Sequence, residues 1–197
     1  PQAPAALSSS GGQIQVSWSS PGGSNPAAFY RVYRSTIETA LVQSSAANHS
    51  YLIADTLGAL AFADLPAQDG LYFYGVTSVD AALNESVLSE IVPAVSDRLV
   101  PTASVDLAGA VPPLGLGQHP INLTVSKVLA SVPILTITPR EQSPVAIDLS
   151  PMTPLLWRGT FTVTADMNAG TAAFTFQGAD FVGNVGSTIT LGSSVFL

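Results

Sequence analysis

Apolar and polar residues alternate with a period of two through much of this chain, and this pattern predicts β-strands. In the first half, Ile14, Val16 and Trp18 alternate with polar residues. The run 72–79 alternates in the same way between turn sequences, the first of which is Asp69-Gly70. Strands that each have one apolar face can share a core. We therefore predict a β-sandwich organised around the stretch 62–86.

Further strands of the first half are expected near 51–53, 60–62 and 86–94. Residues 1–12 read as an extended lead into the first strand, because Gly11-Gly12 turns the chain just before Ile14. Residues 35–50 lack the period-two pattern and are expected to form a short helical turn or an irregular crossover.

The second half repeats the alternation and predicts a second sandwich. Apolar positions recur in the runs 121–125, 155–163 and 172–176, and residues 187–197 are expected to form one closing strand. A chain of 197 residues is too long for one sandwich of about 100 residues and suits two. The fold class is therefore all-β, with two tandem antiparallel β-sandwiches, and we expect domains at residues 1–96 and 97–197.

The first half resembles fibronectin type III domains in their bacterial form. The residues that carry this resemblance are Pro1, Pro4, Trp18, Pro21, the YRVYRS run at 30–35, Tyr72 as a tyrosine corner, and Asn84-Glu85-Ser86. The second half resembles bacterial immunoglobulin-like modules through NLTVSK at 122–127, W-x-G-T-F at 157–161 and GADFVGN at 178–184. The resemblances imply a fibronectin type III-like sandwich followed by an immunoglobulin-like one. They imply no particular activity, because this architecture hosts many roles.

Composition narrows the classes of partner. Charged residues make up only 10% of the chain, and the net charge is -7 with six Lys and Arg residues scattered singly. No basic stripe is available to neutralise phosphates, so nucleic acid is not an expected partner. No apolar run approaches the roughly 20 residues that cross a bilayer, so no membrane insertion is expected. The low Lys content and the many Ser, Thr and Gly residues favour an extracellular or cell-surface location.

The usual local signatures of catalysis are missing from the sequence. There is no cysteine, no G-x-S-x-G elbow, no phosphate loop and no H-E-x-x-H pair, and His49 and His119 belong to different halves. Asp64 and Asp69 flank the turn before residue 72, so a hydrolase with two distant carboxylates stays an alternative, although both stand in turn sequences. We expect no enzyme, no catalytic residue and no cofactor.

One motif occurs once in each half, directly after an aromatic strand. Asp80 and Asn84 are four residues apart, and so are Asp180 and Asn184. Asp accepts hydrogen bonds from backbone amides within a turn and Asn tolerates positive φ, so this spacing predicts one turn design used twice. The alternative is a calcium loop, but neither segment has the dense acidic pattern of such loops. We therefore expect no metal site.

The predicted function is that of a structural or adhesive tandem of an exported surface protein, acting as a scaffold, a spacer or a self-assembling filament subunit. The alternative is a carbohydrate- or protein-binding accessory module of a larger secreted enzyme. Protein partners, including copies of the chain itself, are expected, because few charges protect the sheet edges. The candidate contact surface consists of Tyr33, Phe73, Phe181, Val195, Phe196 and Leu197.

Overall fold

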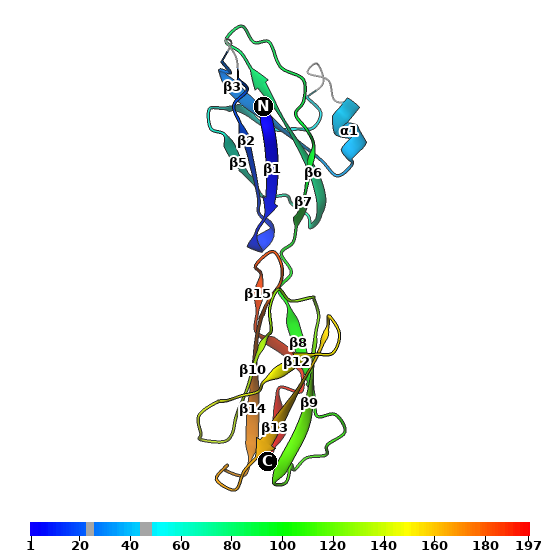
Figure 1. Cartoon of the computed structure of the whole chain (residues 1–197), viewed down its shortest axis with the longest axis vertical. Helices are drawn as coiled ribbons and strands as arrows, with labels where there is room; N and C mark the ends of the chain where they lie inside the picture. Colours follow the sequence, from blue (N-terminus) through cyan, green and yellow to red (C-terminus); the bar gives the residue numbers. More distant parts are fainter. Residues whose placement is uncertain (23–25, 44–48) are drawn as a thin grey trace. The chain divides into compact units, whose positions relative to one another are not determined.

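The computed structural model describes residues 1–22, 26–43 and 49–197 (Figure 1). The chain divides into two compact units, which we call unit 1 (Pro1–Arg98) and unit 2 (Leu99–Leu197). Each unit is a β-sandwich with its own hydrophobic core, which confirms the predicted fold class. The domain ranges 1–96 and 97–197 stay a prediction.

Within the described residues, the strands of unit 1 form a three-stranded and a four-stranded sheet, and all their pairings are antiparallel. The first sheet has the order β1 (Gln2–Ser8), β2 (Ile14–Ser19), β5 (Ala61–Asp64). The second has the order β4 (Leu52–Leu57), β3 (Phe29–Ser35), β6 (Gly70–Val79), β7 (Val92–Ser96). A 3-10 turn, η1 (Ser10–Gly12), and one short helix, α1 (Glu38–Gln43), complete the described elements. This arrangement is a β-sandwich of two antiparallel sheets.

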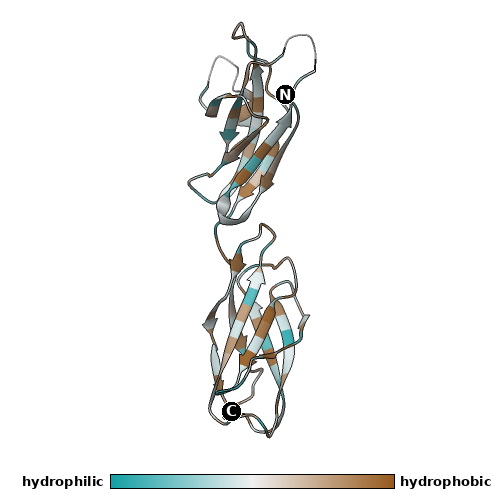
Figure 2. Cartoon of the chain, turned by 90° about the vertical axis from the view of Figure 1, so that its left-hand side faces the viewer, coloured by the Kyte–Doolittle hydropathy of each residue, from teal (hydrophilic) through white to brown (hydrophobic). Residues whose placement is uncertain are grey.

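The core of unit 1 comes from the predicted alternation. Ile14, Val16 and Trp18 of β2 are buried and face Val32 of β3 and Tyr74 of β6. Figure 2 shows the same alternation as brown bands separated by pale or teal ones along the strands. Tyr72 forms the predicted tyrosine corner, because its hydroxyl donates a 2.9 Å hydrogen bond to the backbone oxygen of Gln68.

The four-stranded sheet is covered on its second face as well. Helix α1 packs on β3 and β6, and its Leu41 is fully buried outside the main core cluster. Leu88 packs directly on Gly75 of β6, where a Cβ atom would lie 2.8 Å from the Leu88 side chain. The outer face of this sheet is therefore largely an interior surface.

Two expectations for unit 1 were wrong. Residues 1–12 are not a plain extended lead, because residues 2–8 form strand β1, which pairs with β2. The proline within β1, Pro4, is tolerated because β1 is an edge strand, where a missing backbone N–H need not break a pairing. The strand expected at 86–94 begins only at Val92, because residues 85–89 instead run beside β6 with irregular pairing, in which the N–H groups of Ser86 and Ser89 donate to the backbone oxygens of Ser78 and Val76. The short helical turn expected within 35–50 is confirmed as α1.

Unit 2 consists of two further sheets in its described strands. One has the order β11 (Val145–Ala146), β10 (Ile134–Thr138), β14 (Thr171–Ala179), β15 (Val185–Gly186), with β17 (Ser194–Phe196) also paired to β14. The other has the order β12 (Leu149–Pro151), β13 (Leu156–Val163), β9 (Gly117–Val125), β8 (Thr102–Asp106), β16 (Thr188–Leu191). The β8–β16 pairing is parallel, and the other pairings are antiparallel.

The alternating runs of the second half fill the core of unit 2 as predicted. This core cluster contains Ile121, Leu123, Val125, Trp157, Phe161, Val163, Ala172, Phe174 and Phe176. The single closing strand expected over 187–197 was wrong, since the segment forms β16 in one sheet and β17 in the other. Gly192 permits this switch, because its φ is +71° and a Cβ there would lie 2.0 Å from the Val105 backbone oxygen.

Candidate functional site

A buried carboxylate organises the outer face of the four-stranded sheet in unit 1. The Glu85 side chain is 5% exposed and accepts hydrogen bonds from the Tyr33 hydroxyl at 2.6 Å and the Thr77 hydroxyl at 2.6 Å. The Arg31 guanidinium lies 2.5 Å from Glu85 and also pairs with Asp55 at 2.9 Å. Strands β3, β4 and β6 are thereby tied to the segment that follows β6.

These contacts decide how Glu85 and Tyr33 titrate. Burial opposes ionisation of Glu85, but the hydrogen bonds from Thr77, Tyr33, His49 and Arg31 outweigh it and hold the pKa of Glu85 below its usual value. Burial, together with the hydrogen bond to Glu85, raises the pKa of the Tyr33 hydroxyl far above its usual value. The Glu85 carboxylate is therefore a charged anchor for the loop.

Asp64, a candidate of the hydrolase alternative, lies in a second buried network. Both carboxylate oxygens accept from Arg34 Nη1, at 2.9 and 2.8 Å, and one of them also accepts from the Tyr74 hydroxyl at 2.7 Å. Because Asp64 belongs to β5 and its partners to β3 and β6, this network joins the two sheets of unit 1. Asp69, the other candidate, pairs with Arg98 at 2.5 Å.

The repeated Asp–Asn motif forms the same turn in both units, as predicted, although the positive φ expected at Asn lies one residue earlier, at Leu83 and Gly183. In unit 1, Asp80 Oδ1 accepts from the backbone N–H of Asn84 at 2.9 Å, and the Asn84 side chain donates to Asp80 Oδ2 at 3.0 Å. In unit 2 the two corresponding distances between Asp180 and Asn184 are also 2.9 and 3.0 Å. The carboxylates therefore close turns through donors of the chain itself.

The turn of unit 2 carries one further contact. The ammonium group of Lys127, the one lysine in the sequence, lies 2.5 Å from Asp180 Oδ2 and also donates to the backbone oxygen of Leu99. Burial opposes ionisation of Asp180, but the contacts with Lys127 and Asn184 hold its pKa below the usual value. This ion pair ties the start of unit 2 to the turn after β14.

The six candidate contact residues differ sharply in exposure. Three are buried, which contradicts their assignment to an exposed surface: Tyr33 (2% exposed), Val195 (5%) and Leu197 (8%). Tyr33 is covered because the Glu85 segment lies over its face of the sheet. Val195 and Leu197 join the core of unit 2, where β17 pairs with β14. Phe73 is half-buried, while Phe181 (74%) and Phe196 (53%) remain exposed.

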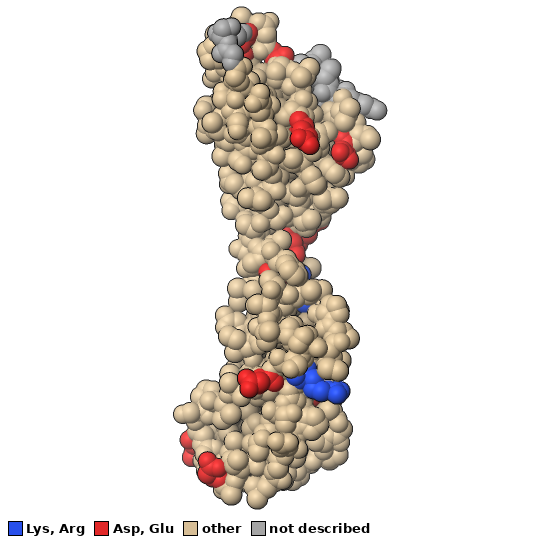
Figure 3. Space-filling model, viewed as in Figure 1, with Lys and Arg blue, Asp and Glu red and all other residues tan. Residues whose placement is uncertain are grey.

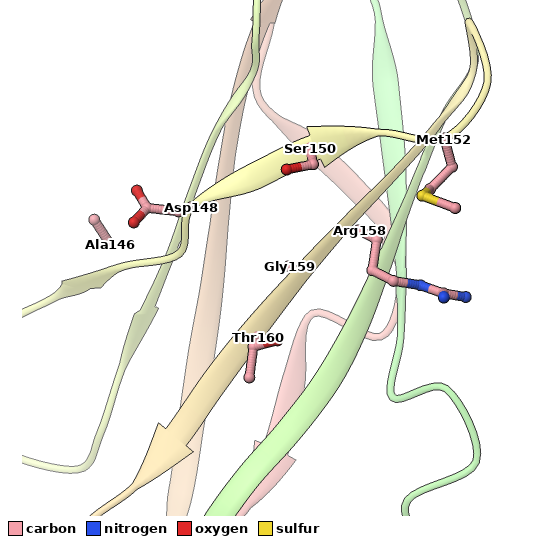
Figure 4. A pocket seen from close by; sticks show the side chains of 7 residues that line it. All are labelled: Ala146, Asp148, Ser150, Met152, Arg158, Gly159 and Thr160. Atoms are coloured by element: carbon pink, nitrogen blue, oxygen red, sulfur yellow. The ribbon is translucent and has the colours of Figure 1, made fainter.

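A pocket of about 480 Å³ lies on unit 2, beside the start of β13 (Figure 4). Residues from β12, β13 and the segment before β12 line it, among them Asp148, Ser150, Met152, Arg158, Gly159 and Thr160. Sequence reasoning missed this site, because Asp148 and Arg158 stand in no motif and meet only through the pairing of β12 with β13.

Two further findings concern the described part of the chain. No helix there is long and apolar enough to span a membrane. Nor does any group of three or more His, Asp or Glu side chains there lie close enough together to hold a metal ion.

Comparison with known proteins yields distant structural likenesses. No protein-family model matches the sequence, and no curated protein matches it. Among solved structures, the chain is similar to fibronectin(III)-like modules of Clostridium thermocellum CbhA, with 13% identity, a TM-score of 0.44 and coverage of 97% of this chain and 90% of that one.

Two other solved structures show similar likenesses. A tetra-tandem repeat in the extending region of a large adhesion protein gives 12% identity and a TM-score of 0.38, over 94% of this chain and 44% of that one. The α-L-rhamnosidase from Dictyoglumus thermophilum gives 9% identity and a TM-score of 0.39, over 98% of this chain and 29% of that one. At these identities and TM-scores, none of the likenesses assigns a function to this chain.

Proposed function

We propose that this chain is a non-catalytic structural tandem of an exported surface protein, in which the two sandwiches serve as a spacer or scaffold. The observation that carries the proposal is the use of the buried carboxylates. Glu85, Asp64 and Asp180 each bind donors of their own unit and thereby fasten loops and sheets together. A general acid or base must instead exchange a proton with a substrate.

Surface composition supports the extracellular part of the proposal. Uncharged residues cover most of the face of each unit seen in Figure 3, with a few acidic and basic side chains between them. Such a surface follows from a chain with 10% charged residues and 47% hydrophobic ones. Weak charge repulsion between copies also favours protein partners, including further copies of this chain. Phe181 and Phe196 are the exposed aromatic contacts that we propose for such association.

Single-molecule force spectroscopy on the whole chain tests the spacer function. Two separate unfolding events are expected, one for each sandwich, each releasing roughly 300 Å of chain, since about 100 extended residues span at most roughly 3.3–3.6 Å each. Glu85→Gln should lower the force of one event and leave the other unchanged, because the Glu85 network lies within unit 1. Gradual extension without distinct unfolding events would contradict a spacer whose folded units resist a stretching force.

A second candidate function is an accessory binding module of a larger secreted enzyme. The pocket beside β13 is the observation that favours it, because opposite charges line the pocket without forming a pair. A spacer can carry such a site, so the two functions do not exclude each other.

A further inference from the structure

The pocket beside β13 is lined by solvent-exposed polar groups, most of which have no protein partner within the described residues. Asp148 forms no hydrogen bond or ion pair within the described residues, and the hydroxyls of Ser150 and Thr160 also lack partners there. Arg158 uses its Nε to donate to Asn122 Oδ1 at 3.2 Å, and its other guanidinium N–H groups have no acceptor in the same part of the chain. A carboxylate and a guanidinium thus line one pocket without pairing.

Elsewhere in the two units, cationic side chains form ion pairs with carboxylates. Arg31, Arg34, Arg98 and Lys127 each lie within 3 Å of a carboxylate. Arg140 lies 3.4 Å from the Glu141 carboxylate, so Arg158 is the one cationic side chain of the described residues with no carboxylate at ion-pair distance. Groups left unpaired in a pocket can bind a ligand without first breaking an internal ion pair.

Local geometry holds these groups in place. Gly159 lets the segment before β12 lie against β13, because a Cβ there would lie 2.7 Å from Ile147 Cγ2 and 2.8 Å from the Asp148 backbone oxygen. Figure 4 shows Asp148 and Arg158 extending to opposite sides of the pocket, with Ser150 and Thr160 between them. Ser150 also pairs directly with Arg158 in the β12–β13 ladder. Three of these four side chains thus stand on paired strands, and the fourth, Asp148, directly precedes β12.

The donor and acceptor types of these groups indicate the class of ligand. A carboxylate only accepts hydrogen bonds, a guanidinium only donates them, and a hydroxyl does both. A ligand rich in hydroxyl groups suits all three, since some of its hydroxyls can donate to Asp148 while others accept from Arg158. Met152 and Ala146 add a small apolar surface for its C–H groups. The volume falls in the range of small-molecule sites, roughly 300–1,000 Å³.

An extended peptide fits this place less well. Strand addition needs a free sheet edge, and β13 offers none, because Gly159 is paired with Leu149 of β12 on one side and with Ile121 of β9 on the other. The edge strand β12 has only three residues, which is short for pairing with an extended peptide. The pocket also lacks the deep apolar lining that takes a peptide side chain. We infer that the pocket is a saccharide-binding site, in which Asp148, Ser150, Thr160 and Arg158 bind the hydroxyls of a short stretch of sugar chain. This site is independent of the spacer function.

NMR titration of the whole ¹⁵N-labelled chain tests the inference. The probes are cellotetraose, which is neutral, tetragalacturonate, whose carboxylates suit Arg158, and the tetrapeptide Ser-Gly-Thr-Ser. Amide shifts confined to residues 146–160 are expected with at least one saccharide, at a Kd on the order of 1 mM. A response to tetragalacturonate that Arg158→Gln removes would identify an acidic sugar as the ligand.

Thr160 and Thr162 offer a matched pair of variants, because both are exposed on β13 and only Thr160 lines the pocket. Thr160→Val should weaken binding about fivefold to tenfold, the effect of one hydrogen bond, whereas Thr162→Val should not change it. Asp148→Asn should weaken binding about tenfold or more, because a charged acceptor is lost, with exposed Glu141→Gln as its control. The amide spectrum of each variant verifies its fold.

Three outcomes would overturn the inference. The first is no shift with either saccharide up to about 10 mM, tenfold above the expected Kd. The second is equal binding by Thr160→Val and Thr162→Val. The third is a response to the tetrapeptide alone, which would make the pocket a peptide site.

Discussion

At the scale of single residues, pairing decides what the few charges of this protein do. Glu85 is a buried anion that stays ionised, because Arg31, Tyr33 and Thr77 all donate to it or face it. Leaving such a group unpaired in a low-dielectric interior is costly, so each buried charge requires its specific partners. The scarcity of charges therefore makes each pair important for its unit.

The first prediction concerns the acid stability of unit 1. The folded pKa of Glu85 lies below its ordinary value of 4.5, so its stabilising effect is present above the unfolded pKa and is lost as pH falls through the folded pKa. Glu85→Gln should lower the free energy of unfolding by about 2 kcal/mol at neutral pH and should lack this part of the acid-induced loss.

Urea unfolding followed by tryptophan fluorescence, from about pH 3 to pH 7, checks this prediction. Exposed Glu90→Gln is the matched control and should keep the wild-type pH dependence. The proposed role of Glu85 is wrong if both variants show the same slope of stability against pH.

The second prediction concerns the two tryptophans. Trp18 and Trp157 are buried in separate cores, so replacing either by Ala should cost about 3–5 kcal/mol and affect only the transition of its own unit. Their indole N–H groups have no partner within the described residues, so Trp→Phe should cost clearly less than Trp→Ala. Differential scanning calorimetry measures both, and a Trp→Ala variant within about 2 °C of the wild-type Tm contradicts the core assignment.

At the scale of elements, a few backbone positions decide where strands end and change sheets. The Asp80 and Asp180 turns end strands β6 and β14 by the same hydrogen bonds. Gly192 separates β16 from β17, which lie in different sheets. Strand β16, before Gly192, pairs with β8 in one sheet of unit 2, and strand β17, after Gly192, pairs with β14 in the other.

The third prediction tests this switch. Gly192→Ala adds a Cβ that would lie 2.0 Å from a backbone oxygen, at a positive φ. The strained backbone and the clash together should cost about 3 kcal/mol or more. Gly115→Ala is the control, because a Cβ there meets nothing within 4 Å. Chemical denaturation compares the two variants, and equal stabilities would show that the segment switches sheets without strain.

For the whole molecule, a surface with few charges offers little electrostatic repulsion against contacts between its exposed apolar groups and other proteins. Phe181 and Phe196 are exposed on unit 2, whereas Val195 and Leu197 stabilise its core and cannot serve two roles at once. The self-association that we propose therefore uses exposed side chains such as Phe181 and Phe196 rather than release of the last strand.

The fourth prediction follows from this distinction. The chain should self-associate at high concentration in sedimentation velocity, and the double variant Phe181→Ser, Phe196→Ser should weaken the association without a change in Tm, because both side chains are exposed. Phe174→Ser is the contrasting variant, since it is buried and should unfold unit 2. A wild-type chain that stays monomeric at every concentration rejects the self-assembly proposal.

The fold class, the runs that form the cores and the repeated turn could all be predicted from the sequence. Period-two alternation and an Asp followed four residues later by Asn are local signals, and local chemistry acts on them directly. The burial of Trp18 and Trp157 follows from the alternation, whereas the tyrosine corner of Tyr72 was implied by the resemblance to fibronectin type III domains.

The tertiary structure, and no local sequence pattern, brings the interacting polar residues together. Glu85 and Arg31 are 54 residues apart in the chain, and Asp148 reaches the pocket of Arg158 only because β12 pairs with β13. The tertiary structure also places Glu85 over Tyr33 and divides the last segment into β16 and β17 in different sheets. Both features depend on contacts between segments that are far apart in the chain. Alternation shows which way a side chain points from its strand, whereas what lies over that face depends on contacts between residues far apart in the chain.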